Sequence, residues 1–242
     1  MNGLVLENVC AGYGAVTVLH DVSLTVREGE LVALLGMNGN GKSTLLNAIL
    51  GFVRPSAGSI RLDWEGESTE LSGREPHRVV DLGIGYVPEG RRLVPNLTVE
   101  ENLRLAAAGR SRPDLKDNLA FCFETFPILA ERRRQLASTM SGGQQQQLAI
   151  ARALMTSPRI MVIDEPSVGL APIVVDQMIQ AIKTLQSEKN MTILMAEQSF
   201  FQAVEVASRA YVLAHGRVVH AIEHGLDADA IETIRKAMMG VD

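Results

Sequence analysis

A run of apolar residues, Leu31–Leu35, leads directly into a glycine-rich segment, and this junction constrains the fold more than any other part of the chain. Glycines let the backbone turn tightly, so that several N–H groups point into one small volume at the start of the following helix. Such a strand, turn and helix favour an anion as ligand. The segment consists of Gly36, Met37, Asn38, Gly39, Asn40, Gly41, Lys42, Ser43 and Thr44.

The spacing Gly-x-x-x-x-Gly-Lys-Ser resembles the P-loop of nucleotide triphosphatases. In that interpretation the Lys42 ammonium contacts the β- and γ-phosphates, and the Ser43 hydroxyl is offered to Mg²⁺. The alternative is a strand, turn and helix that needs glycines only for its shape. Because the strand, the spacing, the lysine and the serine occur together, we expect a site for a nucleoside triphosphate.

The composition limits the partners of the chain. It has 242 residues, enough for one large α/β domain or a core with a smaller subdomain, and a net charge of −5. The basic runs at 91–92 and 132–134 are short, so nucleic acid is disfavoured as a partner. Cys10 and Cys122 lie far apart and predict neither a zinc site nor a disulfide framework, which fits a reducing cytosol. No apolar run approaches the length of about 18 residues that spans a bilayer, so we expect the chain to serve any membrane from outside it.

The order of segments predicts an α/β core with an inserted helical part. Residues 1–95 are β-rich and include the P-loop, residues 96–145 change to a helical pattern with a capping box at Thr98–Glu101, and residues 146–242 return to alternating strands and helices. The β-α-β alternation implies a parallel sheet covered by helices. We expect one domain with a mixed sheet, an antiparallel region near the N-terminus, a helical subdomain and a final helix within Asp227–Met239.

A second apolar strand, Ile160–Ile163, ends in two acids, Asp164 and Glu165. At the carboxyl edge of a parallel sheet, an acid beside the P-loop is placed to hold Mg²⁺, and its neighbour is placed to polarise the attacking water. An apolar run that ends in Asp-Glu is also common at ordinary strand ends. With Lys42 in the same chain, we predict that Asp164 belongs to a metal site and that Glu165 is catalytic.

A third motif lies before that strand, within Thr139–Leu148. Its serine and glycines offer a hydroxyl and backbone donors at a helix N-terminus, which makes a second anion site without a lysine. The alternative is a glycine-rich helix cap followed by a polar run of glutamines. The motif residues are Ser141, Gly142, Gly143 and Gln144.

The order of P-loop, Ser-Gly-Gly-Gln motif and Asp-Glu strand resembles the ATP-binding cassette (ABC) family over nearly the whole chain, with Met140 where the signature usually has Leu. The resemblance implies ATP hydrolysis by two cassettes that close head to tail, so that Ser141–Gln144 of one chain meets the γ-phosphate held by Lys42 of the other. It places Tyr13 where an aromatic ring stacks on adenine, although a tyrosine in a glycine-flanked turn is about as often structural. It also implies that Ser167–Ala171 contacts the opposite subunit.

Two positions depart from the usual ABC pattern. Gln198 stands where most members have a switch histidine, and Glu89 stands where they have glutamine. A carboxylate ligates Mg²⁺ as an amide does but adds a charge. The resemblance therefore implies a metal site of Ser43, Glu89 and Asp164, with Gln198 as a weaker sensor of the γ-phosphate.

Short stretches narrow the resemblance to one subgroup: Pro-Glu-Gly-Arg-Arg, Thr-Val-Glu-Glu-Asn-Leu, Ser-Val-Gly-Leu-Ala-Pro and Glu-Gln-Ser. They are similar to the ATPase subunits of branched-chain amino-acid importers, in the form of the smaller of the two; importers of urea or amides share much of the pattern. The implied partners are integral-membrane permease subunits docked near Glu89–Asn102, a second cassette in a homodimer or heterodimer, and indirectly a solute-binding protein. The implied location is peripheral, on the cytoplasmic face of a bacterial inner membrane.

The sequence leaves two other functions open. The replacement of histidine by Gln198 is compatible with a regulatory cassette that closes on ATP with little hydrolysis. An ABC ATPase that acts on DNA or the ribosome is less consistent with a single short acidic chain, because such proteins resemble tandem cassettes or cassettes split by long coiled-coil inserts.

Overall fold

The computed structural model describes residues 2–108, 115–223 and 232. Apart from residue 232, the final helix expected within Asp227–Met239 lies outside the described residues. The strands are β1 (Gly3–Tyr13), β2 (Val16–Arg27), β3 (Leu31–Leu35), β4 (Ala57–Trp64), β5 (Glu67–Glu70), β6 (Ile84–Val87), β7 (Ile160–Asp164), β8 (Thr192–Glu197), β9 (Arg209–Ala214) and β10 (Arg217–Ile222). The helices are α1 (Lys42–Ile49), α2 (Pro76–Asp81), α3 (Val99–Ala106), α4 (Leu115–Thr125), α5 (Pro127–Glu131), α6 (Gly142–Leu154), α7 (Pro172–Lys189) and α8 (Phe200–Val204), with a short 3₁₀ helix, η1, at Ala137–Thr139.

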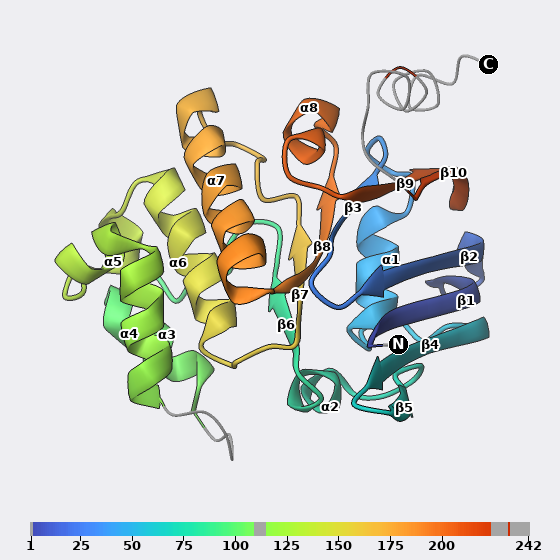
Figure 1. The fold of residues 1–242 in the computed structure, drawn as a ribbon, viewed down its shortest axis with the longest axis horizontal. Helices are drawn as coiled ribbons and strands as arrows, with labels where there is room; N and C mark the ends of the chain where they lie inside the picture. Colours follow the sequence, from blue (N-terminus) through green and yellow to red (C-terminus); the bar gives the residue numbers. More distant parts are fainter. Residues whose placement is uncertain (1, 109–114, 224–231, 233–242) are drawn as a thin grey trace.

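A sheet in the order β10-β9-β3-β8-β7-β6 forms the centre of the fold (Figure 1). Its strands run parallel, except that β10 pairs antiparallel with β9. The carboxyl ends of parallel strands share one edge of a sheet, so the segments that follow β3, β7 and β8 meet at the same edge. The mixed sheet with parallel strands confirms the predicted α/β class.

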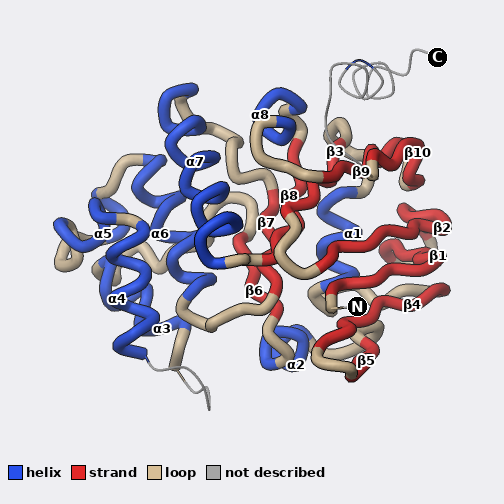
Figure 2. The backbone as a smooth tube through the Cα atoms, in the orientation of Figure 1, coloured by secondary structure: helices blue, strands red, loops and turns tan. Residues whose placement is uncertain are grey.

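Strand β3 is buried on both of its faces, because successive side chains point to opposite sides of the sheet. Leu31, Ala33 and Leu35 pack on the side that carries α6 and α7, where helices gather in Figure 2. Val32 and Leu34 pack on the other side, against α1 and the N-terminal strands. The continuous apolar run that precedes the P-loop is therefore the sequence of a strand between two hydrophobic layers.

The N-terminal strands form a separate antiparallel sheet in the order β2-β1-β4-β5. Helix α1 contacts β1 and β2 on one side and β7 on the other, so it lies between the two sheets. Its buried leucines, Leu45 and Leu46, join the same hydrophobic cluster as Val32 and Leu34. This arrangement confirms the antiparallel region expected near the N-terminus, and it holds the start of α1 against the end of β3.

Helices α3, α4 and α5 lie together at one end of the molecule, beside α6 (Figure 1). The predicted capping box is confirmed: the Thr98 side chain accepts from the Glu101 N–H, and the Glu101 carboxylate accepts from the Thr98 N–H. Asn102 is completely buried beneath this helix start. It accepts from the Val94 N–H and donates to the carbonyl oxygens of Val94, Leu97 and Thr98. One side chain thus fixes the path of the chain from the sheet into α3.

Replacing Asn102 by Ala is expected to lower the free energy of unfolding by about 2–3 kcal/mol, because it leaves buried backbone groups without partners. Urea unfolding measures this loss. Asn118→Ala is the matched control, since Asn118 is only partly buried and bonds to Met155 and Ser157 near the surface. Equal losses for the two variants would contradict the role assigned to Asn102.

Sequence patterns do not predict β5, α2 or α8. Strand β5 is polar throughout and mostly exposed, and α2 and α8 span few residues, so none carries a clear periodicity. Among the described residues, no helix combines the length and apolar character that crossing a membrane requires.

Candidate nucleotide site

The P-loop leaves β3 at Leu35 and enters α1 at Lys42 through a tight turn. Gly41 caps the helix at φ 100°, and Gly39 has φ 83°, both in the left-handed region that favours glycine. Gly36 passes so close to β9 that a Cβ atom there would lie 2.5 Å from the Leu213 carbonyl oxygen. The turn therefore needs its glycines, and it presents the N-terminus of α1 to the carboxyl edge of the sheet.

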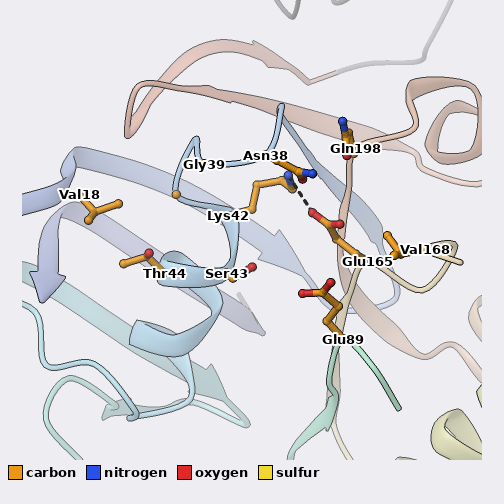
Figure 3. Close-up of a pocket in the computed structure, with 11 residues that line it drawn as sticks. Val18, Asn38, Gly39, Lys42, Ser43, Thr44, Glu89, Glu165, Val168 and Gln198 are labelled. Carbon is orange, nitrogen blue, oxygen red and sulfur yellow. Dashed lines mark ion pairs between the residues drawn. The ribbon is translucent and has the colours of Figure 1, made fainter. Parts of the chain in front are cut away.

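Lys42 extends back over the P-loop and is only 3 % exposed. Its Nζ donates to the carbonyl oxygens of Gly36, at 2.7 Å, and Met37, at 3.3 Å. The same atom forms an ion pair with Glu165 Oε1 at 3.0 Å (Figure 3). The structure thus brings together two residues that the sequence separates widely, the P-loop lysine and the acid predicted to be catalytic.

Ser43 and Asp164 meet beside this pair. The Ser43 hydroxyl donates to Asp164 Oδ1 at 3.5 Å. Asp164 is nearly fully buried, and burial, together with repulsion from Glu165, raises the pKa of its carboxyl to about 6. The raised pKa means that the surroundings of Asp164 stabilise its negative charge poorly. A bound divalent cation would stabilise that charge.

A pocket of about 380 Å³ opens above the P-loop. Figure 3 shows Glu89, Glu165 and Gln198 approaching Lys42 and Ser43 from the segments that follow β6, β7 and β8. Ser43 and Glu89 also line an adjoining cavity of about 540 Å³. The remaining residues that line this second cavity are Asn47, Phe52, Tyr86, Pro88, Arg92 and Asp164.

Three oxygen-bearing side chains of the kind that Mg²⁺ prefers line the second cavity. This ion is usually held by one or two carboxylates, with further oxygens from substrate phosphates and water. Asp164 and Glu89 supply carboxylates, and Ser43 supplies a hydroxyl, beside a helix N-terminus that favours phosphate. The structure brings together the three residues that the resemblance implied, and their role as Mg²⁺ ligands stays a prediction.

The signature motif occupies a different surface. Ser141 caps α6: its hydroxyl accepts from the Gln144 N–H at 3.4 Å, and the Gln144 side-chain oxygen accepts from the Ser141 N–H at 3.1 Å. Ser141 is exposed, and none of Ser141–Gln144 lines the pocket above the P-loop. Gly143 is required by packing, because a Cβ atom there would lie 2.2 Å from a methyl group of Val174 in α7. Within one chain, the P-loop and the signature motif therefore lie on separate surfaces.

Tyr13 does not line the pocket. It is half-exposed at the end of β1, and its hydroxyl accepts from the Asn47 side-chain amide at 3.3 Å. Its role in stacking on adenine stays a prediction. Val18, on β2, does line the pocket but has no signal in the sequence, because only the pairing of distant strands brings it there. Val168 also lines it, from the loop expected to contact a second subunit.

The fold and the site together define an ATP-binding cassette. Residues 19–168 match the family model for ABC transporters, and the chain belongs to this family. It is an ATPase of the ABC transporter class, as the resemblance of its motifs indicated.

Individual members of the family differ in how similar they are to this chain. The chain is 46 % identical to the high-affinity branched-chain amino acid transport ATP-binding protein BraG of Pseudomonas aeruginosa, covering 89 % of this chain and 91 % of the relative. It is 37 % identical to a probable branched-chain amino acid transport ATP-binding protein, LivF, of Archaeoglobus fulgidus, covering 86 % of each chain. The lipopolysaccharide export system ATP-binding protein LptB of Escherichia coli K12 is 32 % identical, with 100 % of this chain and 99 % of the relative covered.

Solved structures of ABC cassettes have the same fold as this chain. The ADP conformation of MJ1267, an ATP-binding cassette of an ABC transporter, superposes with a TM-score of 0.81 and 26 % identity, covering 99 % of this chain and 95 % of that one. A dimeric structure of the bacterial cassette MJ0796 gives a TM-score of 0.77 and 27 % identity, covering 91 % and 98 %. The fold is thus that of cassettes solved both with a nucleotide and as dimers.

Proposed function

We propose that this ATPase powers the uptake of branched-chain amino acids, or of a similar small amino acid or amide, through a membrane permease. One observation carries the proposal: the 46 % identity to BraG over most of both chains. The similarity to LivF supports it as well, whereas the relative named for lipopolysaccharide export is less similar, at 32 % identity. Urea and short amides are the alternative solutes.

The residues of the pocket receive the following roles. Lys42 and the N–H groups of the P-loop, Gly36 to Thr44, hold the phosphates of ATP. Ser43, Glu89 and Asp164 would hold Mg²⁺, which when bound neutralises charge on the phosphates. Glu165 polarises the attacking water, and its ion pair with Lys42 supports this role because it keeps the carboxylate on the phosphate side of the pocket. Gln198 lines the same pocket and is assigned to sensing the γ-phosphate.

Two cassettes are proposed to complete each other's sites. In this arrangement Ser141, Gly142, Gly143 and Gln144 of one cassette contact the γ-phosphate held by Lys42 of the other. The exposed hydroxyl at the start of α6 supports the proposal, because a capped but open helix N-terminus is suited to an anion. Dimeric cassettes among the solved relatives support it further. The pair is either two copies of this chain or one copy and a similar cassette.

A hydrogen-bonded connection joins the metal side of the site to the signature helix. Arg152, on α6, donates to the Arg92 carbonyl oxygen at 2.6 Å and to the Arg91 carbonyl oxygen at 3.1 Å. Arg91 donates in turn to the Gln145 side-chain oxygen at 3.2 Å. The segment that carries Glu89 is therefore fastened to α6, so that closure of the signature on ATP would move both together.

The permease is proposed to dock near Glu89–Asn102 and the helical subdomain. The adjoining cavity is in keeping with this site, because Glu89 and Arg92 of the segment line it together with Phe52, an apolar side chain that is 60 % exposed. The division into parts 1–95, 96–145 and 146–242 belongs to the same proposal. The further partners are a second cassette and, indirectly, a solute-binding protein; nucleic acid is not among them. The proposed location is the cytoplasmic face of a bacterial inner membrane.

Uptake by intact cells tests the proposed function. Deleting the gene for this chain is expected to abolish high-affinity uptake of radiolabelled leucine, isoleucine and valine, and the gene for the parent chain should restore it. The Glu165→Gln gene should not restore it, because the motor would be stalled. Unchanged uptake of these amino acids with lost uptake of urea or short amides would assign the alternative solutes. Unchanged uptake of all of them would contradict an importer.

The raised pKa of Asp164 predicts a pH dependence of Mg²⁺ binding. Because the carboxyl has a pKa of about 6 without metal, it is protonated at lower pH, and protons then compete with the cation. The apparent Mg²⁺ affinity should fall by about tenfold per pH unit below pH 6 and level off above it. The Mg²⁺ dependence of binding of a fluorescent ATP analogue measures this. Asp164→Asn is the control: it should bind Mg²⁺ more weakly and retain only the pH dependence of the nucleotide itself. Identical profiles for the two proteins would contradict the assignment.

A further inference from the structure

A carboxylate that the proposed roles leave unused, Glu197, is completely buried at the end of β8. Strand β8 lies between β3 and β7, the strands that lead to the P-loop and to Asp164. Glu197 pairs in register with Leu35, the last residue before the P-loop, and is followed by Gln198. A carboxyl group is thus buried in the strand that separates the P-loop strand from the strand that ends in Asp164.

Its hydrogen bonds explain how a carboxyl group is tolerated at this buried position. Oε1 accepts from the Ser167 N–H at 3.1 Å, and Oε2 accepts from the Ser167 hydroxyl at 2.9 Å. The backbone N–H of Ser199 also donates to this carboxylate. Burial raises the pKa of Glu197, and these donors oppose that rise. Both carboxylate oxygens are therefore engaged, and both reach the segment that follows the catalytic strand.

The segment that Glu197 holds includes Glu165. Glu165 has φ 43°, a left-handed conformation that a non-glycine residue adopts only where its surroundings enforce it. Its N–H donates to the Ala196 carbonyl oxygen at 3.0 Å, and its carbonyl oxygen accepts from the Val168 N–H at 3.3 Å. The turn from Glu165 to Val168 is therefore attached to the end of β8 at two points, through Glu165 to Ala196 and through Ser167 to Glu197.

We propose that Glu197 is a positioning residue for ATP hydrolysis: by holding Ser167, it fixes the turn that aims Glu165 into the pocket and presents Val168 to the second cassette. The proposal rests on the role of Glu165 in the proposed function. An apolar residue would fill a buried strand position at less cost than a carboxylate, and no cation forms an ion pair with Glu197 among the described residues. The carboxylate supplies an acceptor for the N–H of Ser167 and another for its hydroxyl.

The proposed role of Glu197 affects the rate of ATP hydrolysis and not the binding of ATP. The atoms that hold phosphate belong to the P-loop and α1, and Glu197 bonds to none of them. Loss of the Glu197–Ser167 contact should therefore lower kcat while the affinity of the chain for ATP changes little. A purely structural role would instead lower stability and nucleotide binding together.

A double-mutant cycle of Ser167→Ala and Glu197→Gln tests the contact. Losing a hydrogen bond to a charged group should lower kcat about tenfold in Ser167→Ala, with the Kd for a fluorescent ATP analogue within about twofold of the parent. Ser167→Thr keeps the hydroxyl and should stay within about threefold of the parent kcat. Because both changes break the same contact, the double variant should be no slower than the slower single variant. Ser187→Ala and Glu188→Gln, on the exposed side of α7, are the matched controls.

Three outcomes would overturn the proposal: unchanged kcat in Ser167→Ala, a Ser167→Thr variant as slow as Ser167→Ala, or single effects that multiply in the double variant. If Glu197→Gln fails to fold, the comparison of kcat between Ser167→Ala and Ser167→Thr still tests the proposal. Failure of the proposed function is recognised separately. A parent protein that hydrolyses no ATP, or a Glu165→Gln variant that hydrolyses it normally, would contradict the assigned roles whatever the Ser167 variants do.

Discussion

Replacing Glu165 by Gln should slow ATP hydrolysis by a factor of about 100 or more while ATP stays bound, since a positioned general base contributes on this scale. The amide keeps the volume of the side chain and an oxygen that accepts from Lys42 Nζ, now 3.0 Å from the carboxylate. It loses the charge that draws a proton from water. Phosphate release under saturating Mg·ATP measures the rate.

The same variant should accumulate as an ATP-bound pair of cassettes, because closure no longer leads to hydrolysis and reopening. Size-exclusion chromatography with and without ATP measures this shift. Glu188→Gln, on the exposed surface of α7, is the matched control and should behave as the parent does. Phosphate release by Glu165→Gln at the rate of the parent would remove Glu165 from the chemistry.

Lys42→Ala should weaken ATP binding about 100-fold, as expected when a buried charged partner of the phosphates is removed. The Lys42 ammonium forms the ion pair with Glu165 in the pocket, so the variant also leaves the largely enclosed carboxylate of Glu165 and the buried Asp164 facing the bound phosphates. Repulsion between these acids and the phosphates adds to the loss.

Binding of a fluorescent ATP analogue, with and without Mg²⁺, measures this affinity. Lys183→Ala is the control, since Lys183 is an exposed lysine on α7. A Kd for Lys42→Ala within about threefold of the parent would show that this lysine does not hold phosphate. The circular dichroism spectrum should match that of the parent, because α1 keeps its glycine N-cap.

Local patterns predicted those parts of the site that come from consecutive residues. The strand Leu31–Leu35 and a helix after the glycine-rich segment are predicted and observed, because a short apolar run followed by closely spaced glycines is a local pattern. The capping box at Thr98 was predicted for the same reason: its two side chains are three residues apart. The acids after Ile163 were expected at the sheet edge, and the parallel pairing of β7 with β8 and β6 places them there.

Contacts between distant residues could not be predicted in this way. Glu197 and Ser167 are 30 positions apart, and Arg152 is 60 positions from Arg92. Neither pair has a spacing that marks a contact, because only the order of strands and the packing of α6 bring them together. Tyr13 bonds to Asn47 and does not line the pocket, and its role in stacking on adenine stays a prediction.

The proposed mechanism requires that ATP is bound between the P-loop of one cassette and the signature of another. A crystal structure of Glu165→Gln with Mg·ATP tests it most directly. The predicted result is a pair in which the Ser141 hydroxyl and the N–H groups of Gly142 and Gly143 from one chain contact the γ-phosphate held by Lys42 of its partner. Signatures that face solvent in every assembly, with ATP bound at each P-loop, would contradict the account.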